Sequence, residues 1–265
     1  YGFAVYEDSG KVSVYAYYGT DKNVTTPYKF NGTVVTEIFG GAFAHTSVVS
    51  VSVSEGVTFI GEGAFTGSQL LEKITLPSTV TEINDGAFYG CPKLIDIKGT
   101  AGLKKVGGFA FNDTPWYDTI SDEFAVIGDG ILIKYGGAGG NVTIPEGVKC
   151  IVSAFRGKTD VTGIEFGSSV LAEIGYGSFD GCTGLHTVVI PDSVKKIGIG
   201  SFANCTSLEE VTLGSGVTEI GQSAFLSCDA IAKVKYTGSE SDWEKLSIGE
   251  GNERLTEAKR EYGAK

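Results

Sequence analysis

The stretch EIGQSAFLSC, from Glu219 to Cys228, decides the fold, because close copies of it recur along the chain. The phenylalanine of this motif returns about every 23 residues, with one longer step of about 44 residues between Phe111 and Phe155. Such a period predicts a solenoid, in which each coil buries its apolar side only against its neighbours. The aligned phenylalanines are Phe43, Phe65, Phe88, Phe111, Phe155, Phe179, Phe202 and Phe225.

Each repeat contains two short extended pieces. The first has the form L-x-x-V-x-I-P, as in LHTVVIP at 185–191, and the second has the form V-x-x-I-G-x-x-A/S-F, as in VTEIGQSAF at 217–225. Alternation along a strand places Val211 and Leu213 inward, and Val217 and Ile220 also point inward. The chain then turns at the phenylalanine, and a Cys, Ser or Thr three residues later closes the coil.

Two segments depart from the repeat and predict hairpins of the same type. Residues 3–18 alternate around the turn Asp8-Ser9-Gly10, and residues 124–135 alternate around Gly128-Asp129-Gly130. We expect the first hairpin to cover the first coil, because an open solenoid end exposes apolar surface and unpaired strand edges. The second should pack beside the solenoid without ending it, and a functional loop is the alternative.

The repeat pattern stops after Tyr236. Ser239-x-x-Asp242 indicates a helix start, and Asn252 is expected to cap a second short helix. These helices should cover the C-terminal end of the core, with Trp243 and Leu246 facing it.

The repeat resembles leucine-rich repeats, and specifically the BspA-like family of bacterial surface proteins. The resemblance is carried by I-G-x-x-A/S-F-x-x-C and L-x-x-V-x-I-P, by NDTPWYD at 112–118 before FAVIGDGILIKYGG, and by the ending at 235–258. We therefore expect a mainly β, right-handed repeat solenoid of about eight coils in one structural domain. Its expected parts are a hairpin cap at 1–34, the solenoid at 35–236 with a hairpin insertion at about 112–140, and a short helical cap at 237–265.

Composition excludes some classes of partner. The formal net charge is −11, from 21 basic and 32 acidic residues, which argues against nucleic acid and anionic membranes. No apolar run approaches the ~18 residues of a membrane span. The chain begins at Tyr1 without Met, so we expect any export signal or anchor to lie outside this sequence.

A search for chemistry finds no catalytic or cofactor motif. His45 and His186 have no zinc-type spacing to other ligands, and His186 is expected to be exposed or at an edge. No G-x-S-x-G elbow, phosphate loop or dinucleotide fingerprint occurs. The acidic residues between Asp118 and Asp129 lack the spacing of a calcium loop. We therefore expect a protein that is not an enzyme and needs no cofactor.

The remaining candidate site is the exposed face of the sheet formed by the first pieces. It is rich in Ser and Thr, has mixed charge and carries no aromatic hot spot. The candidate residues are Lys73, Thr75, Asp96, Lys98, Glu165, Thr187, Val189, Glu210, Thr212, Lys233 and Lys235, with Ser50 and Ser52. A purely solvated sheet is the alternative. The aromatic residues lie instead in and near the hairpins, at Tyr6, Tyr15, Tyr17, Tyr18, Trp116, Tyr117 and Tyr135.

The resemblance implies a secreted or surface-displayed monomer that adheres to host or cell-surface proteins such as matrix components. Glycan binding is an alternative, which a row of exposed aromatic residues would favour. A structural spacer of a larger surface protein is the third reading.

Two ladders follow from the register. The residue before each inward Ile should point outward, giving Glu37, Phe59, Glu82, Lys105, Cys150, Glu173, Lys196 and Glu219 down the stack. Cys91, Cys182, Cys205 and Cys228 share one inward slot and should be free thiols, because parallel side-chain vectors suit a disulfide poorly. Cys150 alone should face solvent.

Overall fold

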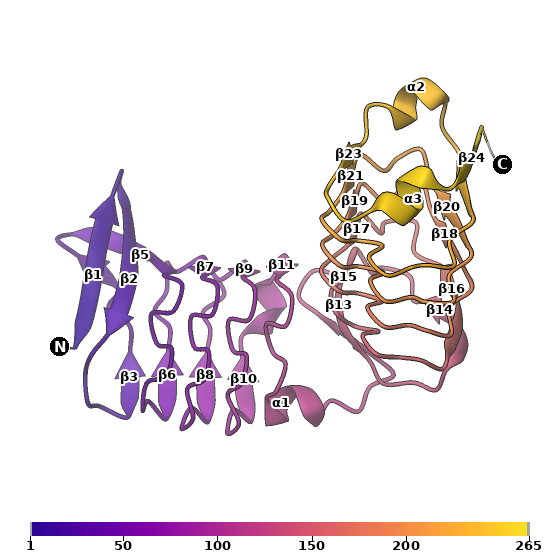
Figure 1. The fold of residues 1–265 in the computed structure, drawn as a ribbon. Coiled ribbons are helices and arrows are strands. Elements are labelled where there is room, and N and C mark those ends of the chain that lie inside the picture. The colour runs from indigo at the N-terminus through magenta and orange to yellow at the C-terminus, as the bar shows by residue number, and fades with distance from the viewer. Residues whose placement is uncertain (1, 264–265) are drawn as a thin grey trace. The chain divides into compact units, whose positions relative to one another are not determined.

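The structure is a computed structural model that describes residues 2–263, drawn as a ribbon in Figure 1. Tyr1, Ala264 and Lys265, which the predicted caps include, lie outside the described residues. The chain forms two compact units, Tyr1–Ser121 with Ile127–Asp129, and Asp122–Val126 with Gly130–Lys265. Each unit is a β-solenoid with two sheets, called A and B here. The predicted boundaries of caps and solenoid stay a prediction.

Sheet A of the first unit has the strand order β1-β2-β5-β7-β9-β11, and β4 pairs with β5. Its strands are β1 Phe3–Asp8, β2 Lys11–Tyr17, β4 Lys29–Phe30, β5 Thr33–Ile38, β7 Phe59–Ile60, β9 Glu82–Ile83 and β11 Lys105–Val106. Sheet B has the order β10-β8-β6-β3, with β3 Asn23–Thr25, β6 Ser50–Ser52, β8 Lys73–Thr75 and β10 Asp96–Lys98. A 3₁₀ turn at Thr100–Gly102 and helix α1 at Pro115–Asp118 complete the unit.

The second unit repeats this plan. Sheet A has the order β12-β13-β15-β17-β19-β21-β23, with β12 Phe124–Ile127, β13 Ile131–Tyr135, β15 Cys150–Ile151, β17 Glu173–Ile174, β19 Lys196–Ile197, β21 Glu219–Ile220 and β23 Ser247–Ile248. The sheet B side has β14 Gly140–Ile144 paired with β16 Val161–Phe166, and then β18 Thr187–Ile190, β20 Glu210–Leu213, β22 Lys233–Tyr236 and β24 Lys259–Tyr262. The two helices are α2 Glu240–Trp243 and α3 Glu253–Glu257.

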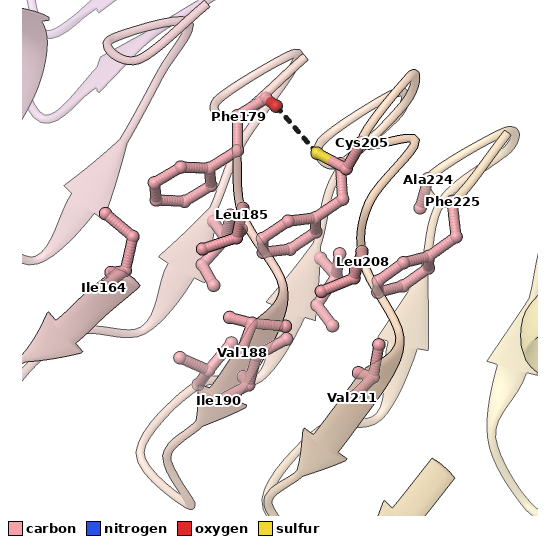
Figure 2. Packing of buried hydrophobic residues seen from close by; sticks show 14 of the residues in the cluster. Ile164, Phe179, Leu185, Val188, Ile190, Cys205, Leu208, Val211, Ala224 and Phe225 are labelled. Atoms are coloured by element: carbon pink, nitrogen blue, oxygen red, sulfur yellow. Dashed lines mark hydrogen bonds between the residues drawn. The ribbon is translucent and has the colours of Figure 1, made fainter. Parts of the chain in front are cut away.

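The repeat phenylalanines form the axis of each core. In the second unit the rings of Phe155, Phe179, Phe202 and Phe225 stack with centroids 4.9 to 5.2 Å apart. Figure 2 shows Phe179 and Phe225 among other buried residues of this core. In the first unit the aligned rings from Phe43 to Phe111 stack in the same way. All of these rings are buried, so the predicted register of inward residues is confirmed.

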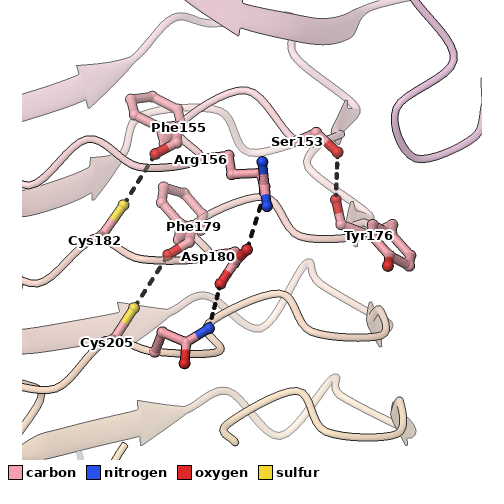
Figure 3. A network of polar contacts seen from close by, with 9 residues as sticks. Ser153, Phe155, Arg156, Tyr176, Phe179, Asp180, Cys182 and Cys205 are labelled. Carbon is pink, nitrogen blue, oxygen red and sulfur yellow. Dashed lines mark hydrogen bonds and ion pairs between the residues drawn. The ribbon is translucent and has the colours of Figure 1, made fainter. Parts of the chain in front are cut away.

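Cysteines in the predicted slot link successive coils by hydrogen bonds. The Sγ of Cys205 donates to the backbone oxygen of Phe179, in the preceding coil, at 3.1 Å, as Figures 2 and 3 show. Cys91, Cys182 and Cys228 make the same contact with the preceding phenylalanine. The slot therefore needs a small side chain with a weak donor, which a thiol provides without a buried unpaired hydroxyl.

Burial makes these thiols poor nucleophiles. It raises the pKa of Cys91 to about 11 and that of Cys182 to about 12. A hydrogen bond with Cys228, together with burial, also raises the pKa of Cys205. The predicted outward Cys150 is half-buried, whereas the other four cysteines are buried.

Labelling of the native protein with a bulky thiol reagent should therefore modify Cys150 first, because the other four thiols are enclosed in the core. Peptide mapping after partial labelling measures the order. The same sample, analysed by mass before labelling, should contain five free thiols. Earlier reaction at Cys182, Cys205 or Cys228, or a disulfide among these three, would contradict the register.

Both predicted hairpins are confirmed, and they open the two units with one module. Ser9 and Gly10 have φ values of 49° and 81°, which suit a two-residue turn between β1 and β2. The ring of Tyr17 stacks on Phe43, and its hydroxyl donates to the backbone oxygen of Asp21. In the second module Tyr135 stacks on Phe155 and donates to the backbone oxygen of Ala138.

The C-terminal cap differs in part from the expectation. Ser239 and Asp242 form a capping box at α2, and Trp243 is buried against Tyr236, as predicted. Asn252 precedes α3, but its side chain does not cap that helix. It turns into the last coil instead, where a buried backbone N–H and two backbone oxygens require partners.

Strand pairing continues beyond Tyr236, where the sequence motif ends. Strand β23 pairs with β21 and β24 pairs with β22, so both sheets continue for one more turn. Strands β2 and β3 together form one further turn at the start of the first unit, and β13 and β14 do the same in the second unit. The total is therefore about 11 turns instead of about eight. The reason is that backbone pairing needs only a free edge of the preceding coil, and not the full side-chain motif.

Candidate binding surfaces

Every predicted face residue lies on a sheet B strand, at an outward position. In the first unit Lys73, Thr75 and Lys98 are exposed and Asp96 is half-buried, on β8 and β10. The residues of the second unit lie on β16, β18, β20 and β22. The structure therefore assigns the predicted face to two surfaces, one on each unit. Its role in binding stays a prediction.

The outer face of the second unit is an ordered grid, which we define as the rows Thr187, Glu210, Lys233, Lys259 and Val189, Thr212, Lys235, Glu261. The sequence analysis missed Lys259 and Glu261, because the segment KREY was assigned to a helical cap. Its alternation of charged and other residues was the available signal. Val189 is the apolar member of the grid and is 60 % exposed.

Opposite charges in this grid form ion pairs. The Nζ of Lys235 lies 2.6 Å from a carboxylate oxygen of Glu210, and the Nζ of Lys233 lies 2.8 Å from one of Glu261. The hydrogen bond to Glu261 raises the pKa of Lys233, and it lowers the pKa of Glu261 in return. These pairs keep long side chains in fixed positions, so a partner meets a surface that is already ordered.

Glu165 is held differently. Its two carboxylate oxygens accept hydrogen bonds from the Asn141 amide and the Thr143 hydroxyl on the neighbouring strand β14. A second polar ladder runs along the turns after the phenylalanines, where Asp180 accepts from both Arg156 and Asn204 (Figure 3). Both arrangements link successive coils rather than converge on one point, and this suits register better than catalysis.

The outward ladder on sheet A is confirmed in its order. Cys150, Glu173, Lys196 and Glu219 are direct cross-strand partners, and the Nζ of Lys196 lies 3.0 Å from Glu219. In the first unit Lys105 pairs with Glu82 at 2.5 Å.

Reversing one charge of this ladder should destabilise the protein mildly. Lys196→Glu replaces an attractive cross-strand pair with like charges, at a cost of about 0.2–1 kcal/mol that salt reduces. Urea unfolding in low and high salt measures the change, with Lys93→Glu, in an exposed turn, as the control. An effect of Lys196→Glu that does not depend on salt would contradict an electrostatic ladder.

Asp192 joins three successive coils. One of its carboxylate oxygens accepts hydrogen bonds from the Thr237 hydroxyl, the Ser215 backbone N–H and the Ser215 hydroxyl. These bonds, Thr237 first, hold the pKa of Asp192 below its ordinary value of 3.8.

A lowered carboxyl pKa means that Asp192 stabilises the fold above the pKa of the unfolded chain and loses this contribution as the pH falls through the folded pKa. Asp192→Asn should therefore be less stable than the wild type at pH 7, and the difference should shrink below about pH 4. Urea midpoints at pH 7, 5 and 3 give the comparison. A constant difference across this range would show that the charge plays no part.

The aromatic residues near the hairpins divide into two groups. Tyr17 and Tyr135 are core, and Trp116 and Tyr117 are half-buried on α1. Tyr6, Tyr15 and Tyr18 are exposed, and so is Phe39, which the sequence analysis did not consider.

Among residues 2–263, no group of three or more His, Cys, Asp or Glu side chains is placed to hold a metal ion. His45 and His186 are both exposed. Within the same described part of the chain, no helix is long and apolar enough to span a membrane.

The comparison with known protein families identifies the same repeat. The family model for the BspA type leucine-rich repeat region matches in six copies, over residues 11–131 and 138–247. No curated protein matches the chain.

Among solved structures, a leucine-rich cell surface protein from Faecalibacterium prausnitzii A2-165 is 21% identical, covers 92% of this chain and 97% of its own, and has a TM-score of 0.41. A leucine-rich repeat protein of T. pallidum is 22% identical, covers 100% and 97%, and has a TM-score of 0.42. The pneumococcal vaccine antigen PcpA is 17% identical, covers 94% and 95%, and has a TM-score of 0.36.

The family assignment rests on the repeat motif, which covers most of the chain, and not on these structures. With that motif and its buried phenylalanine stack, the chain belongs to the BspA-type leucine-rich repeat family, which suggests a protein-binding or structural role.

Proposed function

We propose that this protein is a non-catalytic binding module, secreted or displayed on a cell surface, that adheres to host or cell-surface proteins. The observation that carries the proposal is the outer face of the second unit, where charged pairs on β20, β22 and β24 lie to one side of an exposed apolar residue, Val189 on β18. Protein interfaces combine such elements, with an apolar centre inside a polar rim. Family membership supports this reading, as does the leucine-rich cell surface protein among the similar structures.

Adhesion is tested by binding of the whole chain to immobilised collagen, laminin and fibronectin, and to cultured host cells. Val189→Asp should weaken binding about tenfold or more, because a charge that is buried in an interface must be desolvated. Ile199→Asp is the matched control, since Ile199 is also an exposed aliphatic residue of the second unit but follows sheet A strand β19.

Two results would overturn the proposal. One is a wild type that binds none of these proteins or cells. The other is binding that Val189→Asp and Ile199→Asp weaken equally, which would separate adhesion from this face. Binding to a glycan array in place of proteins would favour the alternative function, and binding to neither would favour a structural spacer.

A further inference from the structure

The first unit carries an exposed aromatic cluster on its hairpin, formed by Tyr6, Tyr15 and Phe39. The three residues are 61 %, 50 % and 48 % exposed. The ring of Tyr15 lies 6.5 Å from Tyr6 and 5.0 Å from Phe39, centroid to centroid. Alternation from buried Val12 and Val14 places Tyr15 on this surface, and the register shift opposite Ala4 and Val5 then turns Tyr17 inward. Large contiguous exposed aromatic groups mark interaction sites.

A hollow of about 340 Å³ lies beside these rings and is lined by Ala4, Val5, Tyr6 and Tyr15. This volume is at the lower end of ligand pockets, which suits one side chain or a small ring. Three of its four lining residues belong to β1. The hollow therefore lies at the edge of sheet A.

Strand β1 is the terminal strand of sheet A and pairs only with β2 in the order of that sheet. It has six residues, as many as β5 and one fewer than β2, and Figure 1 draws it at the end of its sheet. Gly2 accepts a hydrogen bond from the Tyr18 N–H at one end, and the two-residue turn joins Asp8 to Lys11 at the other. In an antiparallel pair, residues alternate between those that bond to the partner strand and those that face away from it. Counted from either end of β1, this alternation directs the backbone N–H and C=O groups of Phe3, Val5 and Glu7 away from β2.

A free edge and an apolar hollow next to it are the two elements of recognition by strand addition. Main-chain hydrogen bonds along the edge give affinity, and a pocket for a side chain gives specificity. Exposed edges of this length are usually blocked in native proteins by Lys, Pro or a covering segment. β1 has the sequence FAVYED, which contains neither Lys nor Pro.

Charge defines the occupant further. The turn end of β1 carries Glu7 and Asp8, and the strand has no basic residue. A second copy of this chain, paired through its own β1, would bring no cation to these carboxylates. A foreign segment with Lys or Arg next to its apolar residues would be complementary.

A sugar fits the same surface less well. The rings are tilted by 56° and 33° to one another, so they do not form one flat platform. Sugar hydroxyls need polar partners, but the carboxylate of Glu37 on the neighbouring strand β5 already accepts hydrogen bonds from Lys11 and Ser13. The residues that line the hollow offer mainly carbon atoms and aromatic rings.

We propose that β1 is a docking edge for an extended segment of a partner protein, which adds a strand to sheet A and places an apolar side chain in the hollow beside Tyr6 and Tyr15. The segment carries Lys or Arg opposite Glu7 and Asp8. This inference rests on the proposed protein-binding function and places a second contact on the first unit.

The test separates the edge from the hollow. Val5→Pro removes an outward N–H without removing a bond to β2, and proline is tolerated at such edge positions. Val5→Thr keeps the N–H and the branched shape. Tyr15→Ser empties one wall of the hollow, and Tyr28→Ser removes a tyrosine of similar exposure, 52 %, elsewhere in the first unit. Circular dichroism and thermal midpoints verify that all four variants are folded.

The probe is a phage library of random 12-residue peptides, selected on the whole chain and measured afterwards as synthetic peptides. The expected peptides alternate β-branched or aromatic residues and carry Lys or Arg at one end. Val5→Pro and Tyr15→Ser should weaken them about tenfold or more, and Val5→Thr and Tyr28→Ser should stay within about twofold of the wild type. Amide hydrogen exchange should show new protection at Phe3, Val5 and Glu7.

Other outcomes overturn the proposal. These are no selected peptide, peptides that bind Val5→Pro as well as the wild type, and proline-rich peptides, which dock on aromatic grooves without strand pairing. A glycan-array signal lost in Tyr15→Ser identifies a sugar site instead. Self-association in sedimentation that Val5→Pro abolishes identifies a second copy. Adhesion through Val189 uses the other unit and is measured separately, so either idea can fail alone.

Discussion

Phe202→Ala should lower the free energy of unfolding by about 3–5 kcal/mol, as expected for deleting a fully buried aromatic ring. The ring of Phe202 lies 5.1 Å from Phe179 and 5.2 Å from Phe225, so its removal takes a stacking partner from two coils at once. The neighbouring coils are fixed by their strand pairs, which limits collapse into the cavity. The backbone oxygen that accepts the Cys228 thiol is retained in the variant.

Urea unfolding followed by circular dichroism measures the effect. Leu226→Ala is the control, because Leu226 follows the next repeat phenylalanine but is exposed. Its unfolding free energy should stay within about 0.5 kcal/mol of the wild type. An unchanged midpoint for Phe202→Ala would contradict the stacked core.

Asn252→Ala should cost about 2–4 kcal/mol, although the residue lies outside the repeat motif. Its side chain is buried, accepts a hydrogen bond from the Phe225 N–H at 3.0 Å, and donates to the backbone oxygens of Gly221 and Gly249 at 2.9 and 2.7 Å. Each buried group left without a partner costs about 1–3 kcal/mol, and partial relaxation reduces the sum. Asn252 thus provides hydrogen-bond partners for backbone groups of the last coil, as the next repeat does for the other coils.

Asn252→Asp is the informative companion. It retains an acceptor for the Phe225 N–H but places a carboxylate against two backbone oxygens, so we expect it to be at least as destabilising at pH 7. Asn141→Ala, at an exposed asparagine paired with Glu165, should be within about 1 kcal/mol of the wild type. Faster hydrogen exchange of the Phe225 amide in Asn252→Ala would localise the defect. Equal stability of Asn252→Ala and the wild type would refute this role.

The inward and outward register was predictable from the sequence because every coil meets a near copy of itself. A residue such as Ile220 or Phe225 has the same neighbours in each repeat, so period alone determines its burial. The same reasoning correctly ordered the ladder of Cys150, Glu173 and Lys196. Local turn and cap chemistry also sufficed for the hairpin at Ser9-Gly10 and the capping box at Ser239.

The candidate surfaces were only half predictable. Period placed Lys235 and Val189 outward, but it did not pair Lys235 with Glu210, nor add Glu261 beside them. Those contacts depend on the side-chain rotamers and on strand β24, which no sequence motif predicted. Likewise, alternation along β2 predicts the same face for Tyr15 and Tyr17. The shift in register between them is what leaves Tyr15 exposed and Tyr17 buried.

The sequence by itself determined the repeat unit, its buried phenylalanine axis and the two hairpin modules, since these depend on residues close in the chain or on identical neighbours. Only the tertiary structure decided the ends. There the last coil meets a different segment, and free backbone groups are satisfied by whatever lies nearest, as Asn252 and strand β24 show. It also decided which edge stays open, because the pairing of β1 on one side only is a property of the assembled sheet.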